Sequence, residues 1–203
     1  MRDKTSIGVV IGLGVILATL IYLYVAFGAA GARNTPAMRN ATPAVTSKTG
    51  AILSGAHFSL ALPSGWQSVT PLSGVDAMAE DPHEHLTDPA AVTAHFKSYI
   101  AVKNDSLAGT TFAKYDNSVT AQLKQLDPQA ALSHKNATAI GGHKADTLEA
   151  TMSANGLALH ILMALMQGDH NDVWIVSCNT TQSMWNTYSA ACYHAVESFT
   201  VKQ

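Results

Sequence analysis

The sequence predicts an α+β fold, in which helices pack on an antiparallel β-sheet, preceded by one N-terminal transmembrane helix. Three observations lead to this fold class: an uncharged apolar run from Ile7 to Phe27, an Asn155-Gly156 pair between two strand-like runs, and helical spacing of large apolar residues within 181–198. Asn-Gly between strand-like runs is a strong hairpin signal. Helices that lie apart from consecutive strands, instead of alternating with them, are typical of α+β domains.

Residues 1–27 are predicted to be a membrane anchor. At about 1.5 Å per residue, a helix from Ile7 to Phe27 is long enough for a hydrocarbon core of about 30 Å. A cleaved signal peptide is the alternative, because Ala30-Gly31-Ala32 resembles a small-residue cleavage site. The apolar part of a signal peptide is usually only about 7–15 residues long. We therefore expect a retained signal-anchor that contacts the lipid bilayer.

The charge of the chain restricts its partners. The formal net charge is −2 at pH 7, and only 13% of the residues are charged. This near-neutral balance gives no electrostatic basis for binding nucleic acid. We therefore expect no nucleic acid among its partners. The apolar run is expected to contact lipid, and the folded domain is expected to bind protein.

Two further segments follow the anchor. Residues 28–50 are rich in Ala, Thr, Asn and Pro and show no apolar periodicity, which predicts a linker. Residues 51–203 are long enough to form one hydrophobic core and are predicted to be the folded domain.

Most of the folded domain reads as strands. A hairpin is predicted from 57–62 and 66–69, which Pro63-Ser64-Gly65 joins as a turn. Residues 72–91 are expected to be mostly loop. Further strands are expected at 96–102, 131–139, 143–153, 157–167 and 172–178. The last three of these strands form a predicted antiparallel meander.

Two helices complete the domain. In residues 111–126, an apolar stripe at Val119, Leu123 and Leu126 predicts a helix that ends before Pro128. A second helix is predicted over 181–198, with Thr181 as its cap. One face of this helix and its continuation carries the large or apolar residues Trp185, Tyr188, Cys192, Ala195 and Phe199. We expect that face to pack on the sheet.

Three signposts give the domain a family resemblance. The first is the run from Phe58 to Trp66, F-x-x-x-x-P-x-G-W, near the start of the domain. The second is Ile140-Gly141-Gly142 before a long hairpin, and the third is Glu197-Ser198-Phe199 after the terminal helix. With these signposts the chain resembles the PsbP-like family (PsbP/DcrB-type fold), here as a membrane-anchored member. The resemblance implies an α+β fold and a protein-binding role, and it brings no catalytic motif.

The orientation of the anchor follows from several weak signals together. Basic residues lie on both sides of the predicted span, Arg2 and Lys4 before it and Arg33 and Arg39 after it, so the positive-inside count is nearly even. The family resemblance and the two cysteines favour an N-terminus in the cytoplasm. We therefore expect a single-pass protein of the cell inner membrane, with its C-terminal domain in the periplasm.

The segment from Asp76 to Asp88 is the most polar part of the domain. It holds two histidines, His83 and His85, which would point the same way in an extended chain and are candidate metal ligands. A solvated acidic loop is the simpler reading, because a metal site also needs a third fixed ligand. As a recognition surface, the segment offers its carboxylates to a partner: Asp76, Glu80, Asp81, Glu84 and Asp88.

No catalytic residue and no cofactor is predicted. The sequence contains no nucleophile elbow, P-loop or dinucleotide fingerprint. His160 lies among apolar residues of a strand, and we expect it to be hydrogen-bonded on a sheet face rather than to bind a ligand. The Met and Trp residues of the strands and helix are expected in the core.

The two cysteines, Cys178 and Cys192, are compatible with an oxidising compartment. With a strand ending at Cys178 and a helix from Thr181, Cys192 would lie about 15 Å along the helix axis. That position is too far for a disulfide, which needs Cα atoms within about 7 Å. The sequence therefore favours two free buried thiols.

Two functions remain open at this point. The first is a non-catalytic accessory or scaffold subunit, in which an anchored periplasmic domain docks on a photosynthetic, respiratory, transport or envelope membrane protein complex. The second is a periplasmic module that binds a small ligand or a metal. An enzyme is not expected, although a fold alone does not decide function.

Overall fold

A computed structural model describes residues 50–135 and 139–202 of the chain. The predicted membrane span, Ile7 to Phe27, and almost all of the predicted linker lie outside the described residues. Within the described ranges, no helix is long and apolar enough to cross a membrane.

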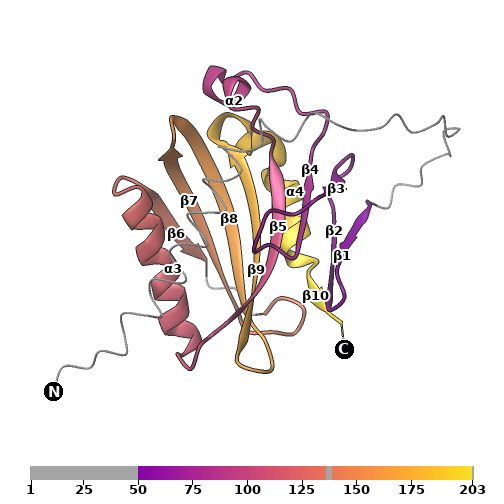
Figure 1. Cartoon of the computed structure of the whole chain (residues 1–203), viewed down its shortest axis with the longest axis vertical. Helices are drawn as coiled ribbons and strands as arrows, with labels where there is room; N and C mark the ends of the chain where they lie inside the picture. Colours follow the sequence, from indigo (N-terminus) through magenta and orange to yellow (C-terminus); the bar gives the residue numbers. More distant parts are fainter. Residues whose placement is uncertain (1–49, 136–138, 203) are drawn as a thin grey trace, which may run out of the picture.

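A seven-stranded antiparallel sheet forms the centre of the domain (Figure 1). Its strand order is β3-β4-β5-β9-β8-β7-β6. The strands are β3 (Gln67–Val69), β4 (Ala77–Glu80), β5 (Tyr99–Ser106), β6 (Ala131–Lys135), β7 (Ala145–Ala154), β8 (Leu157–Gln167) and β9 (Asp172–Thr181). We call this the main sheet.

The predicted meander is confirmed by β7, β8 and β9. Ala154 pairs with Leu157 across the turn, and the two residues between them, Asn155 and Gly156, have φ values of 50° and 80°. Both positive values suit a tight hairpin turn, for which Asn-Gly is the favoured pair. The Asn155-Gly156 turn therefore fixes the register of β7 and β8 locally.

A second, three-stranded sheet joins the two ends of the domain. It has the order β1-β2-β10, formed by β1 (Ile52–Ser54), β2 (Phe58–Ala61) and β10 (Thr200–Val201). The predicted hairpin between 57–62 and 66–69 is therefore wrong. Both edges of β2 are already occupied by β1 and β10, so β3 pairs with β4 in the main sheet instead.

Helix α3 (Phe112–Leu126) covers one face of the main sheet, as Figure 1 shows. Thr111 caps it by accepting a hydrogen bond from the Lys114 amide, and the helix stops before Pro128 as predicted. Its buried stripe contains Tyr115, Val119 and Leu123. Leu126, which the sequence placed on that stripe, is 41% exposed because it lies in the last turn.

Helix α4 (Trp185–Glu197) and the small sheet cover the other face. Here β2, α4 and Phe199 share a core with Trp174, Val176 and Cys178 of β9. A 3₁₀ turn, η1 (Gln182–Met184), precedes α4, so the predicted helix starts later than expected. Thr181 lies before η1 and makes no side-chain capping bond to it.

The prediction of two free thiols is wrong, because Cys178 and Cys192 form a disulfide with Cα atoms 5.7 Å apart. Strand β9 runs on past Cys178 to Thr181, about 10 Å at 3.3 Å per residue. Helix α4 begins at Trp185 and returns about 10 Å before it reaches Cys192. The outward and return paths cancel, which brings the two cysteines together.

The segment 72–91, expected to be mostly loop, contributes two short elements. Strand β4 adds Ala77–Glu80 to the main sheet between β3 and β5. Helix α2 (Pro89–Thr93) follows, with Asp88 as its N-cap and Pro89 in the first turn, a position that proline tolerates well.

Candidate functional site

The two predicted metal ligands, His83 and His85, are both exposed in the loop between β4 and α2. In the described ranges, the group of His, Cys, Asp and Glu side chains close enough to hold a metal ion is Asp116, His134 and Asp146. His83 and His85 are therefore not brought to a third ligand.

Glu84, a predicted partner-binding residue, is directed inward. It is only 6% exposed, and its carboxylate accepts hydrogen bonds from the amide and the hydroxyl of Ser98. Burial raises the pKa of the Glu84 carboxyl, although the bonds from Ser98 and the charge of Lys97 act in the opposite direction. This residue fixes the loop to the chain before β5 and is not available to a partner.

Other carboxylates of the predicted partner loop also have structural contacts. Asp81 accepts a 2.6 Å hydrogen bond from the Tyr188 hydroxyl, which ties the loop to α4. Asp88 caps α2, and half-buried Glu80 ends β4. Asp76 lies at the other end of β4, where it accepts a hydrogen bond from the Asn104 amide. The predicted acidic loop is thus not one continuous free surface.

A cleft of about 680 Å³ opens between the main sheet and the small sheet. We call it the inter-sheet cleft. Its lining residues come from segments that are far apart in the sequence: residues 55–58, Asp76, Asn104, His143, residues 168–170, Asp172, Trp174, Val201 and Lys202. Sequence patterns do not show that such distant segments meet, so Asp76 is the one lining residue that belonged to a site predicted from the sequence.

The inter-sheet cleft contains more carboxylates than ammonium groups. Asp76, Asp169 and Asp172 lie in it with a single lysine, Lys202, which itself contacts the Gly55 carbonyl. Asn104 joins two of the acids: its backbone N–H donates to the Asp76 carboxylate, and its side-chain amide donates to the Asp172 carboxylate at 3.1 Å. Burial opposes the ionisation of Asp172, but hydrogen bonds from His170 and Asn104 outweigh it and lower its pKa.

Three histidines complete the cleft. His57 and His170 are exposed at its rim, and His143 is half-buried. The His143 ring contacts the Gln167 carbonyl through Nδ1 at 3.1 Å, and Asp169 lies 3.9 Å from the same nitrogen. Behind these polar groups, Trp174 packs on Phe58 with ring centroids 5.6 Å apart. The arrangement offers polar and charged groups on a fixed aromatic base.

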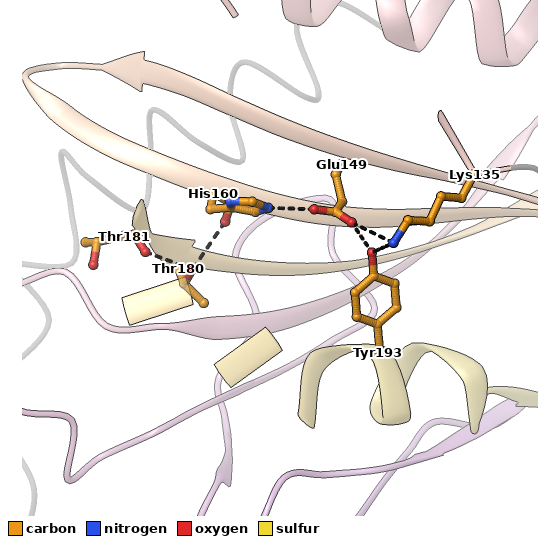
Figure 2. Close-up of polar contacts among 6 residues, drawn as sticks. All are labelled: Lys135, Glu149, His160, Thr180, Thr181 and Tyr193. Carbon is orange, nitrogen blue, oxygen red and sulfur yellow. Dashed lines mark hydrogen bonds and ion pairs between the residues drawn. The ribbon is translucent and has the colours of Figure 1, made fainter. Parts of the chain in front are cut away.

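A separate polar cluster on the α4 face is centred on Glu149 (Figure 2). Its carboxylate accepts hydrogen bonds from His160, at 3.0 Å, and from the Tyr193 hydroxyl, and it forms a 3.2 Å ion pair with Lys135. We call these four residues the Glu149 network. The His160 ring stacks on Trp185 with centroids 3.7 Å apart. His160 is therefore hydrogen-bonded on a sheet face, as the sequence predicted.

The Glu149 network contains side chains of types that enzymes use, but its members are directed at one another. Burial opposes ionisation of Glu149, but the bonds from Tyr193, His160 and Lys135 outweigh it and lower its pKa. Burial lowers the pKa of His160 despite the nearby carboxylate, which favours the neutral ring. The network thus connects strands β6, β7 and β8 to α4, which is a structural role.

These features together define an α+β sheet protein with a polar surface cleft and internally bonded ionisable groups. The PsbP family model matches residues 54–201, and the chain belongs to the PsbP family. Its resemblance to that family, seen in the sequence from Phe58 to Trp66, is thereby confirmed. No curated protein sequence matches the chain significantly.

Two solved structures share the fold. The solution structure of the cyanobacterial PsbP, CyanoP, from Synechocystis has a TM-score of 0.54 at 16% identity and covers 80% of this chain and 98% of its own. The crystal structure of LpqN from Mycobacterium tuberculosis, described as involved in cell envelope biogenesis, has a TM-score of 0.51 at 14% identity. It covers 72% of this chain and 83% of its own. At these identities the likeness concerns the fold alone.

Proposed function

We propose that this chain is a non-catalytic accessory subunit whose domain docks on a larger membrane protein complex outside the cytoplasm. The observation that carries the proposal is the inter-sheet cleft, where exposed groups from distant segments face solvent on a rigid base. Functional residues commonly lie on loops that a rigid scaffold positions. The family membership and the internally bonded Glu149 network support a binding role over a catalytic one.

The disulfide between Cys178 and Cys192 supports a location of the domain outside the cytoplasm. Disulfides persist in oxidising compartments such as the bacterial periplasm and are rare in the cytosol. This agrees with an inner-membrane protein whose anchor leaves residues 51–203 in the periplasm. The apolar run from Ile7 to Phe27 is the expected anchor.

The chemistry of the partner follows from the charges in the cleft. Three carboxylates outnumber the one ammonium group, so a basic side chain of the partner is better matched than an acidic one. We therefore expect a complex subunit that presents Lys or Arg to this surface, with Trp174 and Phe58 forming the base beneath it.

A second candidate is a module that binds a small ligand in the same cleft. Its volume, about 680 Å³, lies within the range of about 300–1,000 Å³ that is usual for ligand pockets. The same residues would then surround a small molecule with a cationic group instead of a partner side chain.

Copurification from gently solubilised native membranes separates the two candidates. An accessory subunit is expected in a stoichiometric complex with other membrane proteins, and the complex should weaken when Asp76 and Asp172 are replaced by Asn. A matched control is Asp127→Asn, outside the cleft. A chain that is recovered alone, carrying a small molecule, would favour the ligand-binding module.

A further inference from the structure

Asp116, His134 and Asp146 meet beneath α3 on the main sheet. His134 of β6 lies opposite Leu148 of β7, and Leu148 is buried in the core beneath α3. Asp146 precedes Leu148 by two residues, so both polar side chains point to the face that α3 covers. Asp116 projects from α3 toward them, and one ligand atom from each residue lies within 4.8 Å of the others. Three elements therefore converge on one point.

The two carboxylates at this point lie beside one group that can carry a positive charge, the exposed His134. Asp116 and Asp146 each have one oxygen, Oδ1, that is closed to solvent and has no hydrogen-bond partner in the described part of the chain. The charged groups that act on Asp116 are Asp146 and His134, and neither is a lysine or an arginine. Asp116 and Asp146 are half-buried as whole residues, but a carboxylate oxygen that is closed to solvent normally has a hydrogen bond, a cationic partner or a bound metal.

We propose that Asp116, His134 and Asp146 bind a divalent first-row transition-metal ion of the Mn²⁺ or Zn²⁺ class. One imidazole nitrogen with two carboxylate oxygens suits these ions, whereas Mg²⁺ and Ca²⁺ prefer oxygen ligands alone. Thr120, one helical turn after Asp116, lies 3.4 Å from His134 Nε2 and orients the ring. The three protein ligands leave further coordination positions to water.

The bound ion would connect α3 to β6, the last strand of the main sheet, and to its neighbour β7. A ligand that binds only the folded chain raises its stability in proportion to the logarithm of its concentration. The site lies on the α3 face, whereas the inter-sheet cleft is based on Trp174 in the core of the other face. Metal binding here is therefore independent of the proposed docking function.

The test uses the full chain without a polyhistidine tag, first stripped of metal with a chelator. Calorimetric titration with Zn²⁺ or Mn²⁺ is expected to show one bound ion and a rise in Tm, and Mg²⁺ is expected to bind far more weakly. Asp116→Asn and Asp146→Asn should weaken Zn²⁺ and Mn²⁺ binding by at least about tenfold. In the metal-free state both variants should be as stable as the wild type or more so, because the new amide can donate to the facing carboxylate. Variants that fold as stably as the wild type but bind metal more weakly would show that the two aspartates are metal ligands and not structural residues.

The double variant His83→Ala/His85→Ala is the matched control, because both histidines are exposed and lie outside the proposed site. It should bind Zn²⁺ and Mn²⁺ as the wild type does. The proposal is overturned if the wild-type chain binds neither ion at millimolar concentration, which would leave the two carboxyls to share a proton. Equal binding by the Asn variants, or binding lost only in the His83/His85 variant, would overturn it as well.

Discussion

Glu149 joins the main sheet to helix α4 through polar side-chain contacts. Its carboxylate accepts hydrogen bonds from Tyr193 of α4 and His160 of β8 and forms an ion pair with Lys135 of β6 (Figure 2). His160 in turn stacks on Trp185, at the start of α4. A charged acceptor with several donors contributes more to stability than a neutral hydrogen bond, so we expect Glu149 to be sensitive to substitution.

Glu149→Gln should lower the free energy of unfolding at pH 7 by about 1–2 kcal/mol, because an amide cannot accept from all three donors. The pKa of Glu149 is lowered from 4.5 in the folded chain, so its contribution is present above that pH and is lost as the pH falls. The difference between wild type and variant should therefore shrink below pH 4.5. Urea denaturation across this range measures it, with exposed Glu197→Gln as the control. A difference that grows on acidification would contradict the assignment.

Glu84 should show the opposite dependence on pH. Burial raises its pKa above 4.5 in the folded chain, so the folded state binds the proton more tightly than the unfolded state. Wild-type stability relative to Glu84→Gln should consequently fall as the pH rises from 4.5 toward neutrality. Denaturation of the two proteins at matched pH values checks this, and a relative stability that rises with pH would exclude a raised pKa.

Among the helices and strands, the sequence predicted those features that depend on interactions between residues close together in the chain. Asn155-Gly156 identified the β7–β8 hairpin, and Thr111 with Pro128 bounded α3, because these residues act on their immediate neighbours. The partner of β2 was missed, because β10 pairs with it from the other end of the domain. The inter-sheet cleft was missed for the same reason, since His57, His143 and His170 are brought together only by the two sheets.

The disulfide between β9 and α4 gives a prediction for these two elements. Thiol titration of the denatured, unreduced protein should find no reactive thiol. The double variant Cys178→Ala/Cys192→Ala should lose about 3 kcal/mol of stability, as expected for a loop of about 15 residues. The wild-type protein under reducing conditions is the matched comparison and should be destabilised to a similar degree. Two reactive thiols in the titration would contradict the packing of α4 on β9.

For the whole molecule, the N-terminus and the folded domain are expected to lie on opposite sides of one membrane, which the segment from Ile7 to Phe27 crosses. We predict that the mature protein keeps Ile7 to Phe27, because the apolar run is longer than a signal peptide requires. Protease added to intact spheroplasts should remove the domain after Gly50, and the intact mass of the mature chain should include the anchor. Protection of the domain until lysis would reverse the topology, and a mature chain that starts near Arg33 would exclude the anchor.

We expect the domain to dock through the inter-sheet cleft, and site-specific crosslinking in native membranes would identify the surface that contacts the partner. A photoreactive amino acid would replace His170, exposed at the cleft rim, and in a separate variant Gln125, exposed on α3. Docking through the cleft should give one discrete crosslinked membrane-complex subunit from position 170 and none from position 125. The crosslink from position 170 should be lost when Asp76 and Asp172 are changed to Asn. Crosslinks from position 125 alone, or none from either position, would contradict docking through the cleft.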